Sequence, residues 1–345
     1  MSAVGALVCL TGEYDIPAIE NGHMNPDEEI DKRLAMREWT DLVNLLQMFG
    51  LSVRLMCPRE NGWDNVFAAN GGWAHGDRAL LANFRQPIRR PEQPVFRDWF
   101  ERLGFDRASG KLRLLPPDIF WEGQGDTLVG GSRHVFLGYG MRSSDEAAPY
   151  IQDMLEQDEV LVLLHLVSNY FYHLDTAANA LKPRNAFIYY PPAFAQESRD
   201  KIRSLPMQLM ALSPFLANCF VANSIYIDDV YLLNVPFNAS EESRLLSAKG
   251  QFIAENDPRF RELMSFDRGD WKNNAHLVNK MKKQGIRHPF RVEGLDMNTK
   301  AGYVWFIREL WKLGMKVIPM YTSQFEPSGA GGRCCVMFLD WLPAK

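Results

Sequence analysis

The chain has 345 residues and a formal net charge of −4, with 46% hydrophobic and 23% charged residues. This is the composition of a folded protein with a sizeable core, and the length allows one repeat-built domain or two smaller ones. The slightly acidic balance excludes a broad basic surface for nucleic acid or an anionic membrane. No apolar run is long enough to predict a membrane span, and the N-terminal run over residues 3–10 lacks the basic flank of a signal peptide.

The five cysteines of the chain show neither a disulfide-framework spacing nor a C-x-x-C spacing. Neighbouring Cys334 and Cys335 do not bridge each other easily, so we expect free thiols in a reducing compartment and a cytoplasmic location. The histidines and cysteines also lack metal-ligand spacing, and no metal site is expected.

Short strand-like runs alternate with single helices along the chain. The first predicted elements are a strand at 3–10, a helix at 26–49, strands at 51–56, 65–69 and 79–84, and a helix at 93–103. The next are a strand at 134–138, a helix at 146–156, strands at 160–167 and 186–190, and a helix at 194–204. The last are a helix at 300–313 and strands at 315–320 and 336–339. Glycines at positions 50, 104 and 314 end three of the helices.

This rhythm of strands and helices recurs about five times at intervals of roughly 50–80 residues, which is the behaviour of a repeat architecture. It argues against a Rossmann sheet, and the chain has no glycine-rich dinucleotide fingerprint. Residues 235–296 differ because they are rich in charged and polar residues. We expect this stretch to be an insertion within a single domain that spans residues 1–345.

A glycine-rich segment near the C-terminus, Gly329 to Cys335, leads from a loop into the short apolar strand expected at 336–339. A thiol beside Arg333 and free backbone N–H groups is a candidate nucleophile with a lowered pKa. A buried structural cysteine fits this segment about equally well. The choice between a nucleophilic and a structural cysteine therefore depends on other segments of the chain.

Three further segments carry polar side chains that could accompany such a thiol. Glu122 and Asp126 lie among glycines, a pattern that by itself favours a surface turn about two to one. His173 and Asp175 are two positions apart, so on a strand their side chains would share one face. There the carboxylate could set the imidazole tautomer or bind a cation. Residues 64–72 are polar at both ends of a predicted strand, which is also the pattern of a strand flanked by turns.

Taken together and in this order, these segments resemble the motifs of the guanidino-group-modifying superfamily, which has the five-bladed pentein fold. Its members include arginine deiminases, dimethylarginine dimethylaminohydrolases, amidinotransferases, and succinylarginine and arginine dihydrolases. The similar segments are 64–70, 122–126, 138–142, the His-Leu-Asp-Thr sequence at 173–176, the glycine–cysteine motif at 331–334 and, loosely, 21–42. The resemblance covers nearly the whole chain except residues 235–296. It implies one α/β propeller domain of five ββαβ-type modules around a pseudo-fivefold axis, with the pocket at its centre.

The resemblance also implies an activity, that of a cofactor-free cysteine hydrolase acting on the guanidino carbon of arginine or an arginine derivative through a covalent amidino-thioether. Its implied catalytic residues are Cys334 as nucleophile, His173 as general acid and base, and Glu122 beside His173 or on the guanidinium. Its implied substrate-binding residues are Asp175 on the guanidinium, Arg142 on a carboxylate, and Asn70, Asp64, Asn21 and Arg90, with Arg89 as the other register for Arg90.

Position 70 separates the members of this superfamily. The deiminases have aspartate there, whereas this chain resembles the dihydrolases in carrying Asn70. A neutral amide suits retention of a ureido intermediate for a second hydrolysis, which gives an ornithine-type amine and two ammonia molecules. An amidinotransferase that passes the amidino group to an amine remains an alternative, and an inactive ligand-binding pentein is a second one. The expected partner is a small guanidino compound, while the oligomeric state is left open.

Overall fold

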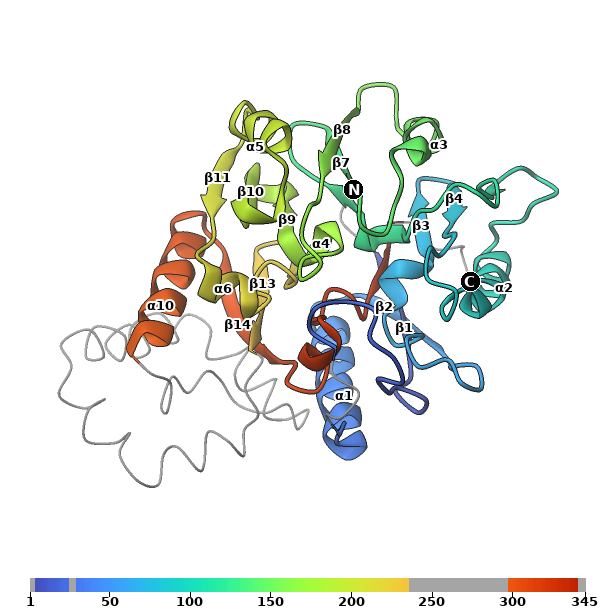
Figure 1. Cartoon of the computed structure of the whole chain (residues 1–345), viewed down its shortest axis with the longest axis horizontal. Helices are drawn as coiled ribbons and strands as arrows, with labels where there is room; N and C mark the ends of the chain where they lie inside the picture. Colours follow the sequence, from blue (N-terminus) through green and yellow to red (C-terminus); the bar gives the residue numbers. More distant parts are fainter. Residues whose placement is uncertain (1–3, 25–28, 236–296, 341–345) are drawn as a thin grey trace.

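The computed structural model describes residues 4–24, 29–235 and 297–340. The strands within these ranges form five separate sheets, each of three strands. Figure 1 shows the sheets arranged in a ring, with one helix of each module on its outside. The pentein fold expected from the resemblance is therefore confirmed.

Four of the modules follow one another along the chain, each in the order strand, strand, helix, strand. The first contains β3 (Gly72–His75), β4 (Arg78–Leu81), α2 (Gln93–Arg102) and β5 (Leu112–Arg113). The second contains β6 (Thr127–Val129), β7 (His134–Tyr139), α3 (Ala148–Gln152) and β8 (Val160–His165). The third contains β9 (Ala178–Leu181), β10 (Ala186–Tyr189), α5 (Gln196–Arg203) and β11 (Gln208–Ala211). The fourth contains β12 (Ile225–Ile227), β13 (Val230–Val235), α10 (Met297–Lys312) and β14 (Lys316–Tyr321).

The fifth module is built from both ends of the chain. Its strands are β15 (Met337–Leu339), β1 (Gly5–Cys9) and β2 (Ser52–Met56), and its helix is α1 (Lys32–Met48). β15 pairs antiparallel with β1, so that Gly5 lies opposite Leu339, and β1 pairs parallel with β2. This pairing closes the ring and fixes the C-terminal cysteines beside the first module.

All five sheets share one pairing pattern. The first strand of each module runs antiparallel to the second, and the second runs parallel to the third. A parallel pair requires a crossover, which the helix of the module supplies. The first strands, β3, β6, β9, β12 and β15, are called the inner strands below. They are only three or four residues long and largely buried.

Helix α1 shows how a module covers its sheet. Asp31 caps the helix, accepting hydrogen bonds from the backbone N–H groups of Arg33 and Leu34. One face buries Trp39, Leu42 and Leu46, and a side chain of this size stabilises the fold by about 1.5–3 kcal/mol when it is fully buried. The helix therefore begins at Lys32 rather than at residue 26, because the cap and not the preceding apolar pattern sets its start.

Two other sequence-based expectations need correction. Residues 65–69 form turns and the start of a short 3₁₀ helix (Ala68–Gly71) instead of a strand, and the strand follows at Gly72. The helix expected at 146–156 is reduced to α3, because the chain turns away after Gln152. The insertion expected at 235–296 lies outside the described residues apart from Val235, and it stays a prediction.

The turns that lead into the inner strands lie at one end of the ring. Asn70 precedes β3, Glu122 precedes β6, His173 precedes β9 and Cys334 precedes β15. The turn before β6 contacts the turn before β3, and this close contact requires a glycine. Gly123 has φ +61°, and a Cβ at this position would lie 2.6 Å from the carbonyl oxygen of Ala69. The fold thus assembles one cluster from turns that are far apart in the sequence.

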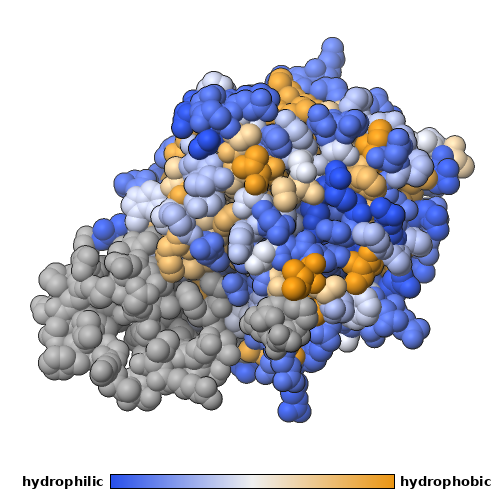
Figure 2. All heavy atoms as spheres, viewed as in Figure 1, coloured by the Kyte–Doolittle hydropathy of each residue, from blue (hydrophilic) through white to orange (hydrophobic). Residues whose placement is uncertain are grey.

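The surface seen in Figure 2 carries hydrophobic residues as separate spots among hydrophilic ones. The apolar side chains are collected instead between the sheets and their helices. Within the described residues, no helix combines the length and the apolar character needed to cross a membrane.

Candidate active site

Five of the residues expected at the site come together at this end of the ring. The thiol of Cys334 donates to Oδ2 of Asp175 at 3.4 Å, and Nε2 of His173 donates to Oε2 of Glu122 at 2.9 Å. Asn70 donates from Nδ2 to the carbonyl oxygen of Glu122 at 3.4 Å. Each of these residues is at most 2% exposed. The cluster therefore combines a thiol, an imidazole and two carboxylates in a largely water-free setting.

The local structure around His173 differs from the expectation. His173 and Asp175 do not lie on a strand; His173 caps the short helix α4 (Leu174–Ala177) and Asp175 lies in its first turn. Asp126 holds this helix by accepting hydrogen bonds from the backbone N–H of Leu174 at 2.9 Å and from Ser143 at 2.6 Å. Burial raises the pKa of Asp126 to about 6. The helical turn directs the imidazole to Glu122 and the carboxylate to Cys334.

The thiol of Cys334 does not have the lowered pKa that its arginine and glycine neighbours suggested. Burial, followed by the charges of Asp175 and Cys335, holds its pKa well above the usual range for cysteine, and the hydrogen bond from Asn223 opposes this shift only in part. The expectation of a lowered pKa is thus wrong, because desolvation and a neighbouring carboxylate outweigh the local donors.

Asn223 is a further residue of the site, which was not predicted from the sequence. Its Nδ2 donates to Sγ of Cys334 at 3.1 Å and to the carbonyl oxygen of Asp175 at 3.0 Å. Its Oδ1 accepts from the backbone N–H groups of Gly331 and Cys334 at 3.0 and 3.2 Å. The sequence does carry a signal for it, since Phe-x-Ala-Asn occurs before β3 at 67–70 and again before β12 at 220–223.

Glu122 is the most firmly held of the carboxylates. Arg142 donates to its Oε2 at 3.3 Å, and the backbone N–H of Arg85 donates to Oε1 at 3.2 Å. Although burial raises the pKa of Glu122, the charges of Arg142 and His173 outweigh burial and leave it well below its usual range. Glu122 is therefore an ionised partner for the imidazole of His173.

The carboxylate of Asp175 has fewer hydrogen-bond partners than that of Glu122. Its Oδ1 is buried and has no hydrogen-bond partner among the described residues. Burial raises the pKa of Asp175 to about 7, opposed by the charge of Arg333 and by hydrogen bonds with Cys334 and Asn223. A buried acceptor without a donor is costly, so this oxygen marks a position where a hydrogen-bond donor would be stabilised.

Arg89 fixes the orientation of the Asn70 amide. Its Nη1 donates to Oδ1 of Asn70 at 3.0 Å, and its other donors bind both carboxylate oxygens of Glu92 at 2.9 Å. Asp64 lies 3.6 Å from Nε of the same guanidinium. The structure therefore brings Arg89 into the cluster. Arg90 is exposed instead, and its guanidinium lies over the ring of Phe120, 5.6 Å from the centroid, in a cation–π contact.

The loop over residues 17–24 covers the cluster from outside. Asn21 is turned to the protein itself, because its Nδ2 donates to the carbonyl oxygen of Ser328 at 3.0 Å and its Oδ1 accepts from the backbone N–H of His23 at 2.9 Å. Arg142 lies over the ring of Tyr172 and donates to the carbonyl oxygen of Glu20 at 3.1 Å. Burial raises the pKa of the Glu20 carboxylate to about 7. Glu20 had not been expected at the site.

No group of three or more histidine, cysteine or acidic side chains within the described ranges is arranged to hold a metal ion.

Comparison with known proteins places this arrangement in context. Residues 17–224 match the profile of the family described as N,N dimethylarginine dimethylhydrolase, eukaryotic. The bifunctional arginine dihydrolase/ornithine cyclodeaminase AgrE of Nostoc sp. is 30% identical over 246 residues, which are 70% of this chain and 34% of that protein. The N(G),N(G)-dimethylarginine dimethylaminohydrolase of Mycobacterium tuberculosis is 34% identical over 54% of this chain and 58% of its own length. The chain thus spans about a third of the cyanobacterial relative.

A solved structure shares the fold over nearly the whole chain. It is the N-terminal domain of ArgZ, an arginine dihydrolase from cyanobacteria, bound to product. The TM-score is 0.72 at 23% identity, with 98% of this chain and 97% of that domain covered.

Proposed function

Since the chain belongs to the N,N dimethylarginine dimethylhydrolase family, we propose that it is a cysteine hydrolase acting on guanidino groups. One observation carries the proposal: the thiol of Cys334 lies 3.4 Å from the carboxylate of Asp175, whose other oxygen is buried without a partner among the described residues. A guanidinium presents its N–H groups in a planar fork that matches a carboxylate. Bound to Asp175, it would place its central carbon beside the thiol.

Binding of such a cation would also activate the thiol. The pKa of Cys334 is raised by burial and by the negative charge of Asp175. A guanidinium between the two groups would offset both effects, since an adjacent positive charge favours the thiolate. The nucleophile would therefore form mainly when substrate is bound, which protects the free enzyme from oxidation and alkylation.

We assign the proton transfers of the reaction to His173. It takes the thiol proton, and the thiolate forms a carbon–sulfur bond to the guanidino carbon. The tetrahedral adduct collapses when His173 returns the proton to one nitrogen, which leaves as ammonia or as a substituted amine. Water, deprotonated by His173, then attacks the amidino-thioether, and cleavage of the carbon–sulfur bond releases the ureido product and restores the thiol. Glu122, 2.9 Å from Nε2 of His173, stabilises the imidazolium formed in each half.

Asn70 supports a second hydrolysis of the ureido product. Arg89 occupies Oδ1 of its amide, so Nδ2 is the group that faces Glu122 and the site. An N–H donor suits the oxygen of a neutral urea, whereas a buried carboxylate at this position would not. With arginine as substrate, the second round would give ornithine, carbon dioxide and a second ammonia. Two relatives named as arginine dihydrolases favour this end point.

Dimethylarginine is a second candidate substrate, favoured by the family profile that matches residues 17–224. The same attack by Cys334 would then release dimethylamine in place of ammonia and end at citrulline. For the remaining residues expected to bind substrate, Arg142, Asp64, Asn21 and Arg90, we retain the assignment as a proposal. Arg89 and Glu20 join this list on the basis of their contacts.

The proposal is tested by incubating the purified protein with arginine and, separately, with dimethylarginine, and by identifying amines and amino acids by mass spectrometry. Ornithine with two equivalents of ammonia supports the dihydrolase, while citrulline with dimethylamine supports the second candidate. Citrulline and one ammonia from arginine would indicate simple deimination. Amidination of an added amine without ammonia would identify an amidinotransferase, and no product from either guanidine would contradict the proposal.

The five cysteines are all free thiols, including the exposed Cys57. Free thiols persist in a reducing compartment, which is the basis for proposing a cytoplasmic location.

A further inference from the structure

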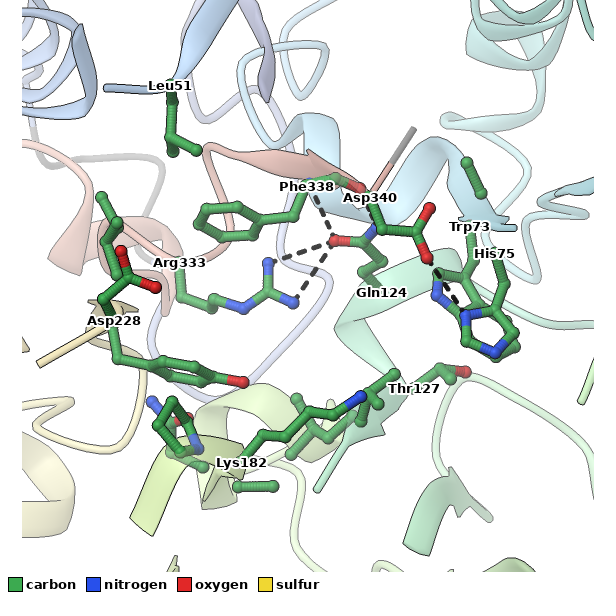
Figure 3. Close-up of a pocket in the computed structure, with 18 residues that line it drawn as sticks. Leu51, Trp73, His75, Gln124, Thr127, Lys182, Asp228, Arg333, Phe338 and Asp340 are labelled. Atoms are coloured by element: carbon green, nitrogen blue, oxygen red, sulfur yellow. Dashed lines mark hydrogen bonds and ion pairs between the residues drawn. The ribbon is translucent and has the colours of Figure 1, made fainter. Parts of the chain in front are cut away.

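A cavity lies at the opposite end of the inner strands from the catalytic cluster. Its volume is about 390 Å³, within the range of small-molecule sites. The inner strands lead from the catalytic turns to this cavity, since β3 begins after Asn70 and ends at His75, which lines it. Gln124 and Arg333 also line the cavity (Figure 3). Gln124 is two positions from Glu122 and Arg333 is next to Cys334 in the chain. These two residues therefore lie on the side of the cavity nearest the catalytic cluster, which is called its floor below.

Arg333 is a cation without a carboxylate partner in this floor. Its guanidinium donates to Oε1 of Gln124 at 3.4 Å and to the carbonyl oxygen of Val336 at 3.0 Å. The ring of Phe338 lies over the guanidinium, with its centroid 4.8 Å from Cζ of Arg333. Burial lowers the pKa of Arg333, and the charge of Asp175 opposes this shift only in part. An anion in the cavity would supply a counter-ion.

Lys182 adds a second positive charge. It follows β9 and extends into the cavity from the side opposite Phe338 (Figure 3). Its charge acts on Glu159, although the two side chains form no direct ion pair within the described ranges. Of the other charged groups, His75 is paired with Glu159 at 2.7 Å and with Oδ2 of Asp340 at 3.3 Å, and Asp228 is exposed. Oδ1 of Asp340 is buried without a partner among the described residues, so the anion has to lie toward Arg333 and Lys182 and away from this oxygen.

The remaining walls are mostly apolar or aromatic. They include Trp73, Tyr226 and Phe338, with Leu128 and Ile227 beside them. A free inorganic ion would leave these surfaces in contact with water, whereas an organic body would bury them. The cavity therefore combines two cations on its polar side with rings that could hold an aromatic or aliphatic group.

We propose that this cavity binds a small organic anion, whose carboxylate or phosphate head group is held by Arg333 and Lys182 and whose apolar body lies against Phe338 and Tyr226. The cavity lies at the other end of the inner strands from the cysteine centre, although the charge of Arg333 also acts on Asp175. The proposal does not depend on the function proposed for that centre. Guanidinium and ammonium groups serve both head groups, so the experiment has to distinguish a carboxylate from a phosphate.

The test is calorimetric titration of the full chain at fixed ionic strength with benzoate, phenyl phosphate and the uncharged control benzamide. We expect saturable binding of one or both anions and none of benzamide, and the anion that binds identifies the head group. Lys182→Met should weaken binding about tenfold, the effect of losing one charge-assisted hydrogen bond. Lys182→Arg should keep most of the affinity, and Lys201→Met, on the exposed side of α5, should leave it unchanged.

Three results would overturn the proposal. The first is the absence of saturable binding by both anions, and the second is binding of benzamide with the affinity of the anions. The third is binding that is the same in Lys182→Met and in the unmodified protein, because the probe would then occupy another place. Since Lys182 is only partly buried, its replacement leaves the fold intact, and the melting temperature of each variant verifies this.

Discussion

Asn223 donates a hydrogen bond to the sulfur of Cys334 at 3.1 Å while its Oδ1 accepts from the backbone N–H of the same residue at 3.2 Å. One side chain from the fourth module thus holds both the thiol and the turn that presents it. We predict that Asn223→Ala lowers kcat by about 10²–10³-fold, the cost of losing a donor that stabilises developing negative charge. The rate of thiol alkylation as a function of pH should shift to higher pH in the variant, because a donor to the thiolate is lost.

The control is the equivalent amide of the first module. Asn70 has the same Phe-x-Ala-Asn context but does not contact the sulfur, so Asn70→Ala should leave the alkylation profile unchanged. An identical shift in both variants would argue that the effect is structural.

His173→Ala should reduce the rate by about 10²–10⁴-fold if the imidazole transfers protons. Its Nε2 contacts Glu122, and its backbone caps α4 without help from the side chain. We therefore expect the circular dichroism and melting temperature to change little. A protein that melts well below the unmodified chain would show instead that His173 mainly supports the core.

Asp175 gives the protein a pH dependence of known sign. Burial raises its pKa to about 7, whereas an aspartate in an unfolded chain titrates near 4. Because the folded state binds this proton more tightly, the contribution of Asp175 to stability falls as the pH rises through this interval and stays low above it. Asp175→Asn should therefore raise the melting temperature more at pH 8 than at pH 5, while turnover is lost. A difference that does not vary with pH would contradict the raised pKa.

Asn70→Asp tests the end point of the reaction. Oδ1 of residue 70 accepts from Arg89 at 3.0 Å, and an aspartate can keep that bond, so the fold should persist. The added charge should strengthen guanidinium binding and disfavour the neutral urea. We expect the product from arginine to shift from ornithine to citrulline, measured by mass spectrometry. Ornithine formed at an unchanged ratio would show that residue 70 does not control the second hydrolysis.

The sequence predicted the longer elements, the order of the motifs and one inner strand, β15 (expected at 336–339). It did not predict the other four inner strands. β7 and α2 could be predicted from the sequence because their apolar patterns persist over at least six residues. β6 and β12 have three residues each, too few for a period to emerge. The cluster of Cys334, His173 and Glu122 was predicted through the resemblance, not from local patterns.

Two features of the site could not be predicted from the local sequence around Cys334. The pKa of Cys334 depends on burial and on Asp175, which is 159 residues away. Asn223 is 111 residues from the thiol that it contacts, and only the repeated Phe-x-Ala-Asn segment connects its role to that of Asn70. Tertiary structure determines both features.

The central claim is that the sulfur of Cys334 becomes bonded to the guanidino carbon. Cys334 and Cys335 lie in the turn before β15 and not on the strand itself, and only Cys334 faces Asp175, since the thiol of Cys335 donates to the carbonyl oxygen of Gly331 at 3.7 Å. Cys334→Ser should therefore abolish turnover, and Cys335→Ser should retain most of it.

The most direct measurement is acid quenching during turnover of arginine labelled with ¹³C at the guanidino carbon, followed by peptide mass spectrometry. We predict label on the peptide that contains both cysteines, its retention in Cys335→Ser and its loss in Cys334→Ser. Turnover without any labelled peptide, or label that persists in Cys334→Ser, would contradict the account.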